Sequence, residues 1–228
     1  GHWGPAQMFI LKGLDIETPD MHGNTPLHAA AASGFVRTVH LLVGRGADVT
    51  RRNEEGKTPL DLVLAKMASR PPLVGLTPLQ IATQQGYDQT LIFLRAVIYE
   101  EVRGAVMRDD AARLSALLDA APDYRDGYLL GLAPAHLAAR EAKLNSLKAL
   151  QDHGANLALI ELTADGYTPL HEAARSGRVD VVRWLLANGV DREAADARGQ
   201  TALQVAQAAQ QNEVASILIA AGQIAPKS

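Results

Sequence analysis

The sequence contains no cysteine among its 228 residues. A disulfide scaffold, a zinc site with cysteine ligands and a cysteine nucleophile are therefore excluded. Aromatic residues make up only 4% of the chain, although 47% of it is hydrophobic. Alanine and leucine supply most of the apolar content. This composition favours helices packed through small side chains over a core built on aromatic rings.

The sequence also lacks a strong charge of either sign, with a net charge of −3 and a pI near 6.2. It therefore has no overall basic field of the kind that draws proteins onto nucleic acid. One basic cluster could meet an acidic partner, but it includes Glu54 and Glu55 and has no interleaved aromatic residue. Its basic members are Arg37, Arg45, Arg51, Arg52 and Lys57. We predict no nucleic-acid partner.

No apolar run reaches the roughly 18–20 residues needed to span a bilayer. The longest, residues 91–99, is short and interrupted by Arg95. Residues 1–20 lack the basic start and apolar core of a signal peptide. We expect no membrane insertion. The compartment is not fixed by the sequence, and a soluble, cytoplasmic protein is favoured.

One eight-residue phrase recurs along the chain, beginning each time at a glycine. It reads GNTPLHAA at 23–30, GKTPLDLV at 56–63, GLTPLQIA at 75–82, GLAPAHLA at 131–138, GYTPLHEA at 166–173 and GQTALQVA at 199–206. The steps between these glycines are 33, 19, 56, 35 and 33 residues. A period near 33 residues is typical of a repeat protein rather than of a single compact core.

The phrase has a physical logic, seen most fully in residues 165–191 (DGYTPLHEAARSGRVDVVRWLLANGVD). Thr168 is a good helix N-cap, and Pro169 suits the first helical position, where its missing N–H costs nothing. Gly177 is placed to end the first helix in a left-handed conformation. The buried stripe of a second helix follows at Val181, Val182, Leu185 and Leu186. Each unit is therefore predicted to be a helix–turn–helix.

In phrase and period the chain resembles the ankyrin-repeat family. The resemblance implies an all-α ankyrin-repeat solenoid of stacked helix–turn–helix units with short β-hairpin tips. It also implies a non-catalytic module that binds another protein. We expect a single ankyrin-repeat domain over 1–228, irregular in the middle. Its parts are a partial repeat at 1–19, regular repeats at 20–66, irregular repeats at 67–130, regular repeats and a C-terminal cap at 131–222, and a tail at 223–228.

The irregular middle begins where only 19 residues separate Gly56 from Gly75. This spacing leaves no room for the second helix of that repeat. We expect the next repeat to have helices near 78–85 and 89–98, followed by a helix pair within 99–123. No turn residue separates Leu91 from Arg103, so one continuous helix stays open as an alternative.

Histidine is the residue type that most invites a catalytic or metal-binding interpretation. His28, His136 and His171 all lie in the repeated phrase. The resemblance implies that this histidine ties one repeat to the backbone of the next. Histidines spread one per repeat cannot converge on a metal, because packed helices lie about 8–10 Å apart. The sequence has neither a phosphate-binding glycine loop nor a serine elbow. We predict no catalytic residue, metal or cofactor.

In the family, the hairpin tips around the glycine of the phrase commonly touch partners. The regular tips here are polar, whereas the tips at 73–76 and 128–132 are apolar. Such apolar tips either mark contact surfaces or fold inward to fill gaps in the irregular middle. Both possibilities stay open at this point.

The predicted partner protein would lie on the concave face formed by the tips and the first helix of each repeat. We expect Glu172 to face solvent or this groove. The candidate contacts, placed by the resemblance, are His22, Asn24, Arg52, Lys57, Tyr128, Leu130, Glu172, Arg175 and Arg198.

Two other functions stay open. The irregular middle, 67–130, could form a small-molecule pocket, or the chain could be a targeting arm of a larger enzyme. Self-association through an uncapped N-terminal end is also possible.

Overall fold

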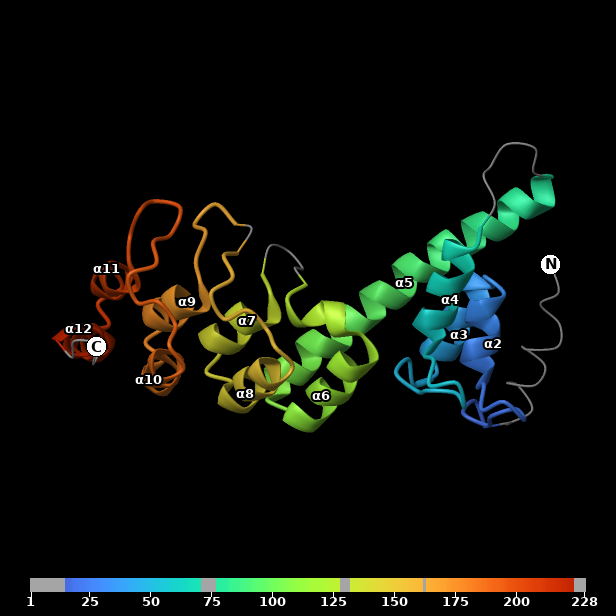
Figure 1. Cartoon of the computed structure of the whole chain (residues 1–228), viewed down its shortest axis with the longest axis horizontal. Helices are drawn as coiled ribbons and strands as arrows, with labels where there is room; N and C mark the ends of the chain where they lie inside the picture. Colours follow the sequence, from blue (N-terminus) through green and yellow to red (C-terminus); the bar gives the residue numbers. More distant parts are fainter. Residues whose placement is uncertain (1–14, 71–76, 128–131, 162, 224–228) are drawn as a thin grey trace. The chain divides into compact units, whose positions relative to one another are not determined.

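The computed structural model describes residues 15–70, 77–127, 132–161 and 163–223 (Figure 1). The chain divides into two compact units, Gly1–Ile98 and Tyr99–Ser228, which are described separately below. The described residues form helices with no strand; Ala195 and Thr201 make an isolated antiparallel bridge. The predicted all-α class is therefore confirmed.

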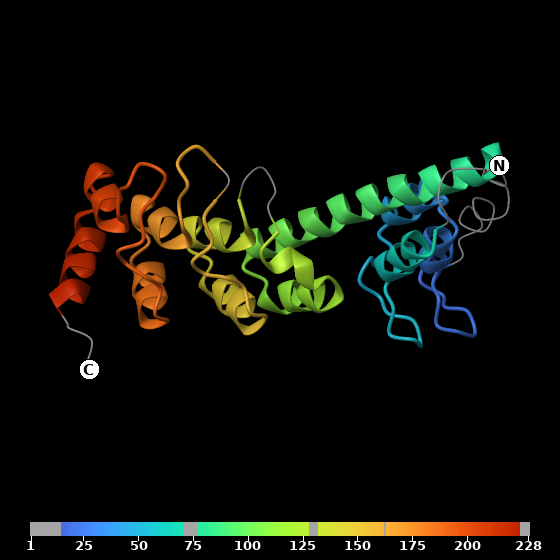
Figure 2. The same ribbon diagram turned by 45° about the horizontal axis from the view of Figure 1, so that its top comes forward.

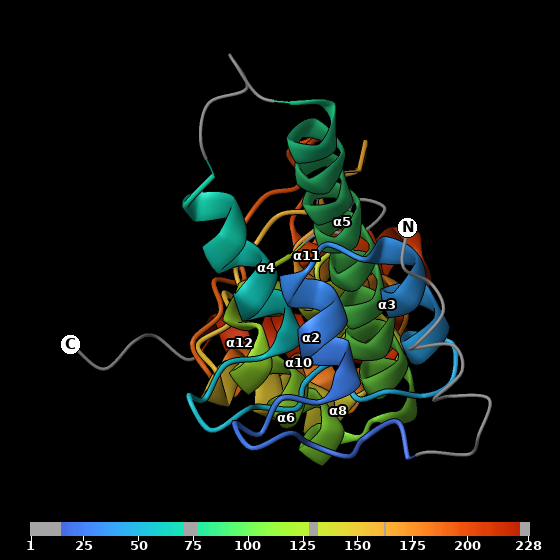
Figure 3. The same cartoon turned by 90° about the vertical axis from the view of Figure 1, so that its right-hand side faces the viewer.

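Unit 1 contains α2 (Pro26–Ala32), α3 (Val36–Val43), α4 (Pro59–Ala68) and the first part of α5 (Pro78–Arg108). Helix α2 packs against both α4 and α3, and Figure 3 shows it between them. Leu27, Val39, Leu42 and Val63 are almost completely buried between these helices.

Unit 2 contains the rest of α5 and a double row of short helices (Figure 2). The elements are α6 (Ala111–Ala120), the 3₁₀ turn η1 (Pro122–Arg125), α7 (Pro134–Arg140), α8 (Leu144–Asp152), α9 (Pro169–Arg175), α10 (Val179–Ala187), α11 (Ala202–Ala208) and α12 (Asn212–Gln223). Helices α7, α9 and α11 stack as an inner row. Helices α6 and α8, and likewise α10 and α12, pack as outer neighbours. Each helix thus buries its apolar side only against adjacent repeats.

The helix starts follow the repeated phrase. The hydroxyl of Thr168 accepts a hydrogen bond from the backbone N–H of His171, and Thr58 accepts one in the same way from Asp61. Proline occupies the first helical position in both helices. The N-cap predicted from the sequence is confirmed, because the cap depends only on residues within one turn of each other.

The helix-to-helix turns are also set locally. In five of them one residue adopts positive φ: Gly34 (66°), Asp109 (55°), Ala142 (56°), Gly177 (67°) and Gln210 (59°). The left-handed end predicted for Gly177 is confirmed. Three of these residues are not glycine, so the turn geometry prevails over a steric cost of roughly 1–2 kcal/mol per residue.

The buried histidines join neighbouring repeats. The backbone N–H of Thr25 donates to Nδ1 of His28 at 3.1 Å, so Nδ1 carries no proton. Nε2 then donates to the carbonyl oxygen of Lys57 in the next repeat at 3.0 Å. Burial lowers the pKa of His28 below its ordinary value of 6.5, which favours this neutral form. The structural role implied for this histidine is confirmed.

His171 repeats this arrangement, with Nε2 3.0 Å from the carbonyl oxygen of Gln200 and Nδ1 2.8 Å from the hydroxyl of Thr168. His136 makes the forward bond to the carbonyl oxygen of Tyr167, also at 3.0 Å. Its Nδ1, however, is buried with no hydrogen-bond partner, because Ala133 stands where the other two repeats have threonine.

The expected division into helices at 78–85 and 89–98 is wrong, and the continuous-helix alternative is correct. Helix α5 runs without a break through Gly86. The gap left by the shortened repeat explains why. The ring of Phe93 stacks on His40 of α3 at 3.6 Å, and the Tyr87 hydroxyl donates to the carbonyl oxygen of Ala32 at 3.1 Å. This part of α5 therefore lies where the missing second helix would lie.

Candidate binding surface

The hairpin tips of unit 1 are rigid turns closed by their own side chains. The carboxylate of Asp20 accepts hydrogen bonds from the backbone N–H groups of His22 (2.8 Å) and Asn24 (2.9 Å). These bonds hold the pKa of Asp20 below its ordinary value. Asn53 closes the next tip in the same way, through the N–H groups of Glu55 and Lys57.

Neighbouring tips are bonded to each other. The N–H of Glu54 donates to the carbonyl oxygen of His22 at 3.1 Å, and Nδ2 of Asn53 donates to Oδ1 of Asn24 at 2.8 Å. Asn24 is half-buried and already engaged in this link, whereas the His22 side chain is exposed. Of these two predicted contacts, His22 is therefore the freer to meet a partner.

Arg52 and Lys57 are also exposed at this tip. The Arg52 guanidinium donates to the carbonyl oxygen of Gly56. The Lys57 ammonium lies 3.0 Å from Glu55. Both interactions are solvent-exposed, so they are weak and a competing partner can displace them.

The corresponding tip of unit 2 has the same construction. Asp196 accepts from the N–H groups of Arg198 and Gln200, each at 2.8 Å. The N–H of Ala197 donates to the carbonyl oxygen of Asp165 in the preceding tip at 3.0 Å. Arg198 forms an exposed ion pair with Asp165. Arg198 thus stands on a tip whose backbone is fixed.

The preceding tip is longer, as the sequence spacing predicted. The N–H of Glu161 donates to the carbonyl oxygen of Tyr167, two residues further on than in the equivalent pair, Asp196 and Gln200. The Glu161 side chain is 5% exposed and its Oε2 has no hydrogen-bond partner.

Glu172 and Arg175 lie one turn apart on α9, at the base of these tips. The expectation that Glu172 faces solvent is wrong, since Glu172 is only 3% exposed. Arg175 covers it, with a guanidinium nitrogen 2.8 Å from the carboxylate, and this hydrogen bond raises the pKa of Arg175. The same guanidinium lies 5.9 Å from the ring centre of Tyr167, which stacks on His171. Arg175 itself is exposed.

Tyr167 and Asp165 were missed as candidates, although both flank Gly166 in the phrase. The aromatic residue next to that glycine was the available signal. Tyr128 and Leu130 lie outside the described residues, as does the other apolar tip at 73–76.

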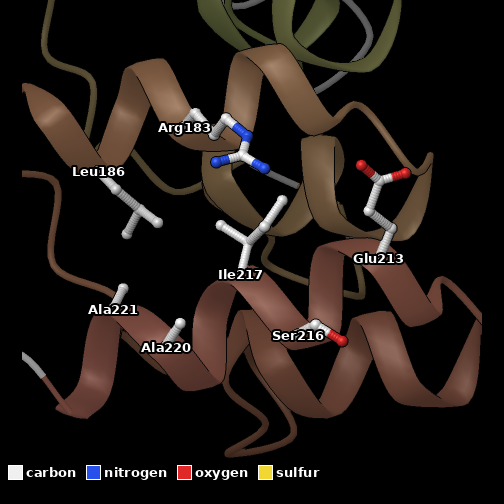
Figure 4. Close-up of a pocket in the computed structure, with 7 residues that line it drawn as sticks. All are labelled: Arg183, Leu186, Glu213, Ser216, Ile217, Ala220 and Ala221. Carbon is white, nitrogen blue, oxygen red and sulfur yellow. The ribbon is translucent and has the colours of Figure 1, made fainter.

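The part of the chain that the structure describes contains no group of three or more His, Asp or Glu residues that could hold a metal ion. Nor do the described helices include one long and apolar enough to cross a membrane. A groove between outer helices α10 and α12 is lined by Arg183 and Leu186 on one side and by Glu213 and Ile217 on the other (Figure 4). It lies away from residues 67–130, where the alternative pocket was predicted.

Comparison with known proteins agrees with this architecture. A family model described as ankyrin repeats (three copies) matches residues 102–196 and 135–227, and one described as ankyrin repeat matches residues 22–54. These matches cover more than half of the chain.

Among curated relatives, the transient receptor potential cation channel subfamily A member 1 homolog of Caenorhabditis elegans is 26% identical over 209 residues. That match covers 84% of this chain and 15% of the channel protein. Human Rabankyrin-5 is 25% identical over 213 residues, covering 81% of this chain and 16% of the relative. Human ankyrin repeat and SOCS box protein 11 is 43% identical over 60 residues, 25% of this chain and 19% of that protein.

The chain thus spans less than one fifth of each of these relatives. What they share with it is the repeat array: the capped inner helices, the left-handed turns and the bonded hairpin tips. The chain belongs to the ankyrin-repeat family.

Proposed function

We propose that this chain is a non-catalytic module that binds a partner protein on the concave surface formed by hairpin tips and inner helices. Ankyrin repeats generally mediate protein–protein interaction and are generally not catalytic. Stacked repeats also create extended surfaces suited to binding.

The observation that carries the proposal is the fixed backbone beneath exposed polar side chains. His22, Arg52 and Lys57 in unit 1, and Arg198 in unit 2, project from turns closed by hydrogen bonds. A preorganised surface loses less conformational entropy on binding, so more of each contact's energy contributes to affinity.

Arg175 is the strongest single contact in the proposal. Its guanidinium is oriented by Glu172 and by the Tyr167 ring, yet it is exposed. Arginine held in this way is enriched among residues that dominate binding energy. Glu172 acts by orienting Arg175, and Asn24 acts by joining two tips. Tyr128 and Leu130 are proposed to add an apolar contact.

The experiment captures the partner from the native cell. A photo-crosslinking amino acid is placed at position 198, on a tip, or at position 183, an exposed arginine on outer helix α10. Mass spectrometry then identifies the proteins captured. The proposal expects a protein that crosslinks from position 198 and not from position 183. Equal capture from both positions contradicts it.

Affinity for the captured protein then tests individual residues. Arg198→Ala is expected to weaken binding about tenfold, the effect of roughly 1.4 kcal/mol. Arg175→Lys keeps the charge beside Glu172 but loses the planar stacking group, and it is expected to weaken binding as well. Arg183→Ala is the matched control and should bind normally. If Arg198→Ala and Arg175→Lys both bind normally, the concave surface is not the binding site.

A further inference from the structure

Gly86 occupies the turn position of its repeat, yet it does not form a turn. Five equivalent positions, Gly34, Asp109, Ala142, Gly177 and Gln210, adopt φ between 55° and 67°. Gly86 instead lies within the continuous helix α5. Glycine is the residue that reaches positive φ at least cost and that weakens a helix interior. By local preference, Gly86 should bend more readily than Asp109, Ala142 or Gln210.

The turns that do form share one hydrogen-bond pattern. In the first, the N–H of Gly34 donates to the carbonyl oxygen of Ala31 and that of Phe35 donates to Ala30. This pair of bonds satisfies the last carbonyl groups of the helix. Gln210 and Gln211 make the same two bonds in the last repeat. The pattern therefore needs neither glycine nor any special side chain.

The residues before Gly86 are those of an inner helix. Thr77 caps this helix through Gln80, whose Oε1 accepts from the Thr77 N–H at 2.8 Å. Thr201 and Gln204 form the same cap at the start of α11, at 2.9 Å. Helix α11 then turns at Gln210 and is followed by α12. The local sequence of residues 77–98 is thus that of a complete helix–turn–helix.

Tertiary contacts around Gly86 hold α5 straight. The carbonyl of Gly34 approaches so closely that a Cβ at position 86 would clash with it. Tyr87 and Phe93 add the bonds to Ala32 and His40 described above. The first turns of α5 gain little in return, because Gln80, Ala82, Thr83 and Gln85 are exposed. Local preference and tertiary packing therefore favour different shapes of the same segment.

We propose that α5 is a two-state element that breaks at Gly86. In its second state, residues 78–85 and 88–98 form two antiparallel helices, and the first of them packs as an inner helix beside α4. This state completes a third regular repeat in unit 1 and enlarges the inner-helix surface. A segment whose two packings are close in free energy is what such a switch requires.

The test measures the distance between residues 80 and 96 by electron paramagnetic resonance. The chain has no cysteine, so Gln80→Cys and Ala96→Cys accept two spin labels without background. In a straight helix these positions, 16 residues apart, are separated by about 24 Å. In an antiparallel helix pair they are separated by about 10 Å.

The matched control is the pair Gln204→Cys and Ala220→Cys, also 16 residues apart and both exposed. Labelling Gln204 removes the same kind of cap that labelling Gln80 removes. These positions lie on α11 and α12, so the control should give only the short distance. The proposal expects both distances, or the short one alone, from the Gln80 and Ala96 pair. A single long distance there, beside a short one in the control, overturns it.

If loss of the Thr77 cap unfolds unit 1, as circular dichroism would show, labels at Ala82 and Ala96 replace the first pair. Neither side chain forms a cap, and both are exposed. The straight helix then predicts about 21 Å, and the broken helix a clearly shorter distance. A long distance alone again rejects the two-state element.

Discussion

Replacing Ala133 by threonine should stabilise the protein, because it supplies the partner that His136 lacks. Nδ1 of His136 is buried and has no hydrogen-bond partner, whereas Nδ1 of His28 and of His171 lies 2.8 Å from a threonine hydroxyl. Those threonines, Thr25 and Thr168, are buried at 1% and 2% exposure. The fold therefore accommodates a threonine at the equivalent position in two other repeats.

The magnitude follows from two effects of one hydroxyl group. An unsatisfied buried polar group costs about 1–3 kcal/mol. Restoring a threonine N-cap is typically worth about 1 kcal/mol. Some adjustment of the tightly packed Ala133 site offsets part of this gain. We expect Ala133→Thr to raise the free energy of unfolding by about 1–2 kcal/mol. For a chain of this size, each 1 kcal/mol raises the melting temperature by about 2–4 °C.

The assay is urea unfolding followed by circular dichroism, with Ala133→Val as the matched control. Valine has the shape of threonine but lacks the hydroxyl, so it adds the same volume without the hydrogen bond. Ala133→Thr should be more stable than Ala133→Val. Equal stability of the two variants would refute the hydrogen-bond explanation. The reverse substitution, Thr168→Val, should destabilise by a similar amount.

Three further predictions concern stability. Burial lowers the pKa of His28, His136 and His171 below 6.5, so the unfolded chain binds protons that the folded chain does not. Their contribution is complete above about pH 6.5 and is lost as the pH falls below it; urea unfolding should show this loss, and His171→Gln should reduce its slope by about a third. An unchanged slope in that variant argues against this origin. Asp109→Ala should cost about 1–3 kcal/mol, because the carboxylate accepts bonds from the N–H and hydroxyl of Ser146 at 2.8 and 2.9 Å; thermal unfolding with the isosteric, neutral Asp109→Asn should show a smaller loss, and equal losses would contradict the role of the charge. Ala142→Gly should stabilise by about 0.5–1 kcal/mol in the same assay, since φ is 56° there and glycine removes the strain at some entropic cost; a lower melting temperature would show that no strain is stored.

Several features were predictable because they depend on residues close in sequence. The cap at Thr168 and the left-handed turn at Gly177 each form within one or two turns of helix. The role of His28 and His171 was predictable for a related reason. Identical phrases in successive repeats place the same histidine against the same carbonyl group, one repeat further on.

Other features depend on which surfaces meet, and the sequence pattern does not encode that directly. Glu172 was expected to be accessible, but Arg175 and the neighbouring tips cover it. Tyr167 was not singled out, although its ring lies under the Arg175 guanidinium. Both errors arise because the exposure of a residue on an inner helix depends on the hairpin that folds over it.

The sequence by itself determined the repeat, its helices and its turns, because threonine caps, prolines, left-handed turn positions and apolar spacing act over a few residues. Only the tertiary structure decided the fate of residues 78–98. There the local signals predict a turn at Gly86, but the missing helix of the shortened repeat leaves a space beside α3. Filling that space buries Phe93 against His40 and keeps α5 straight, so packing overrides the preference of a single glycine.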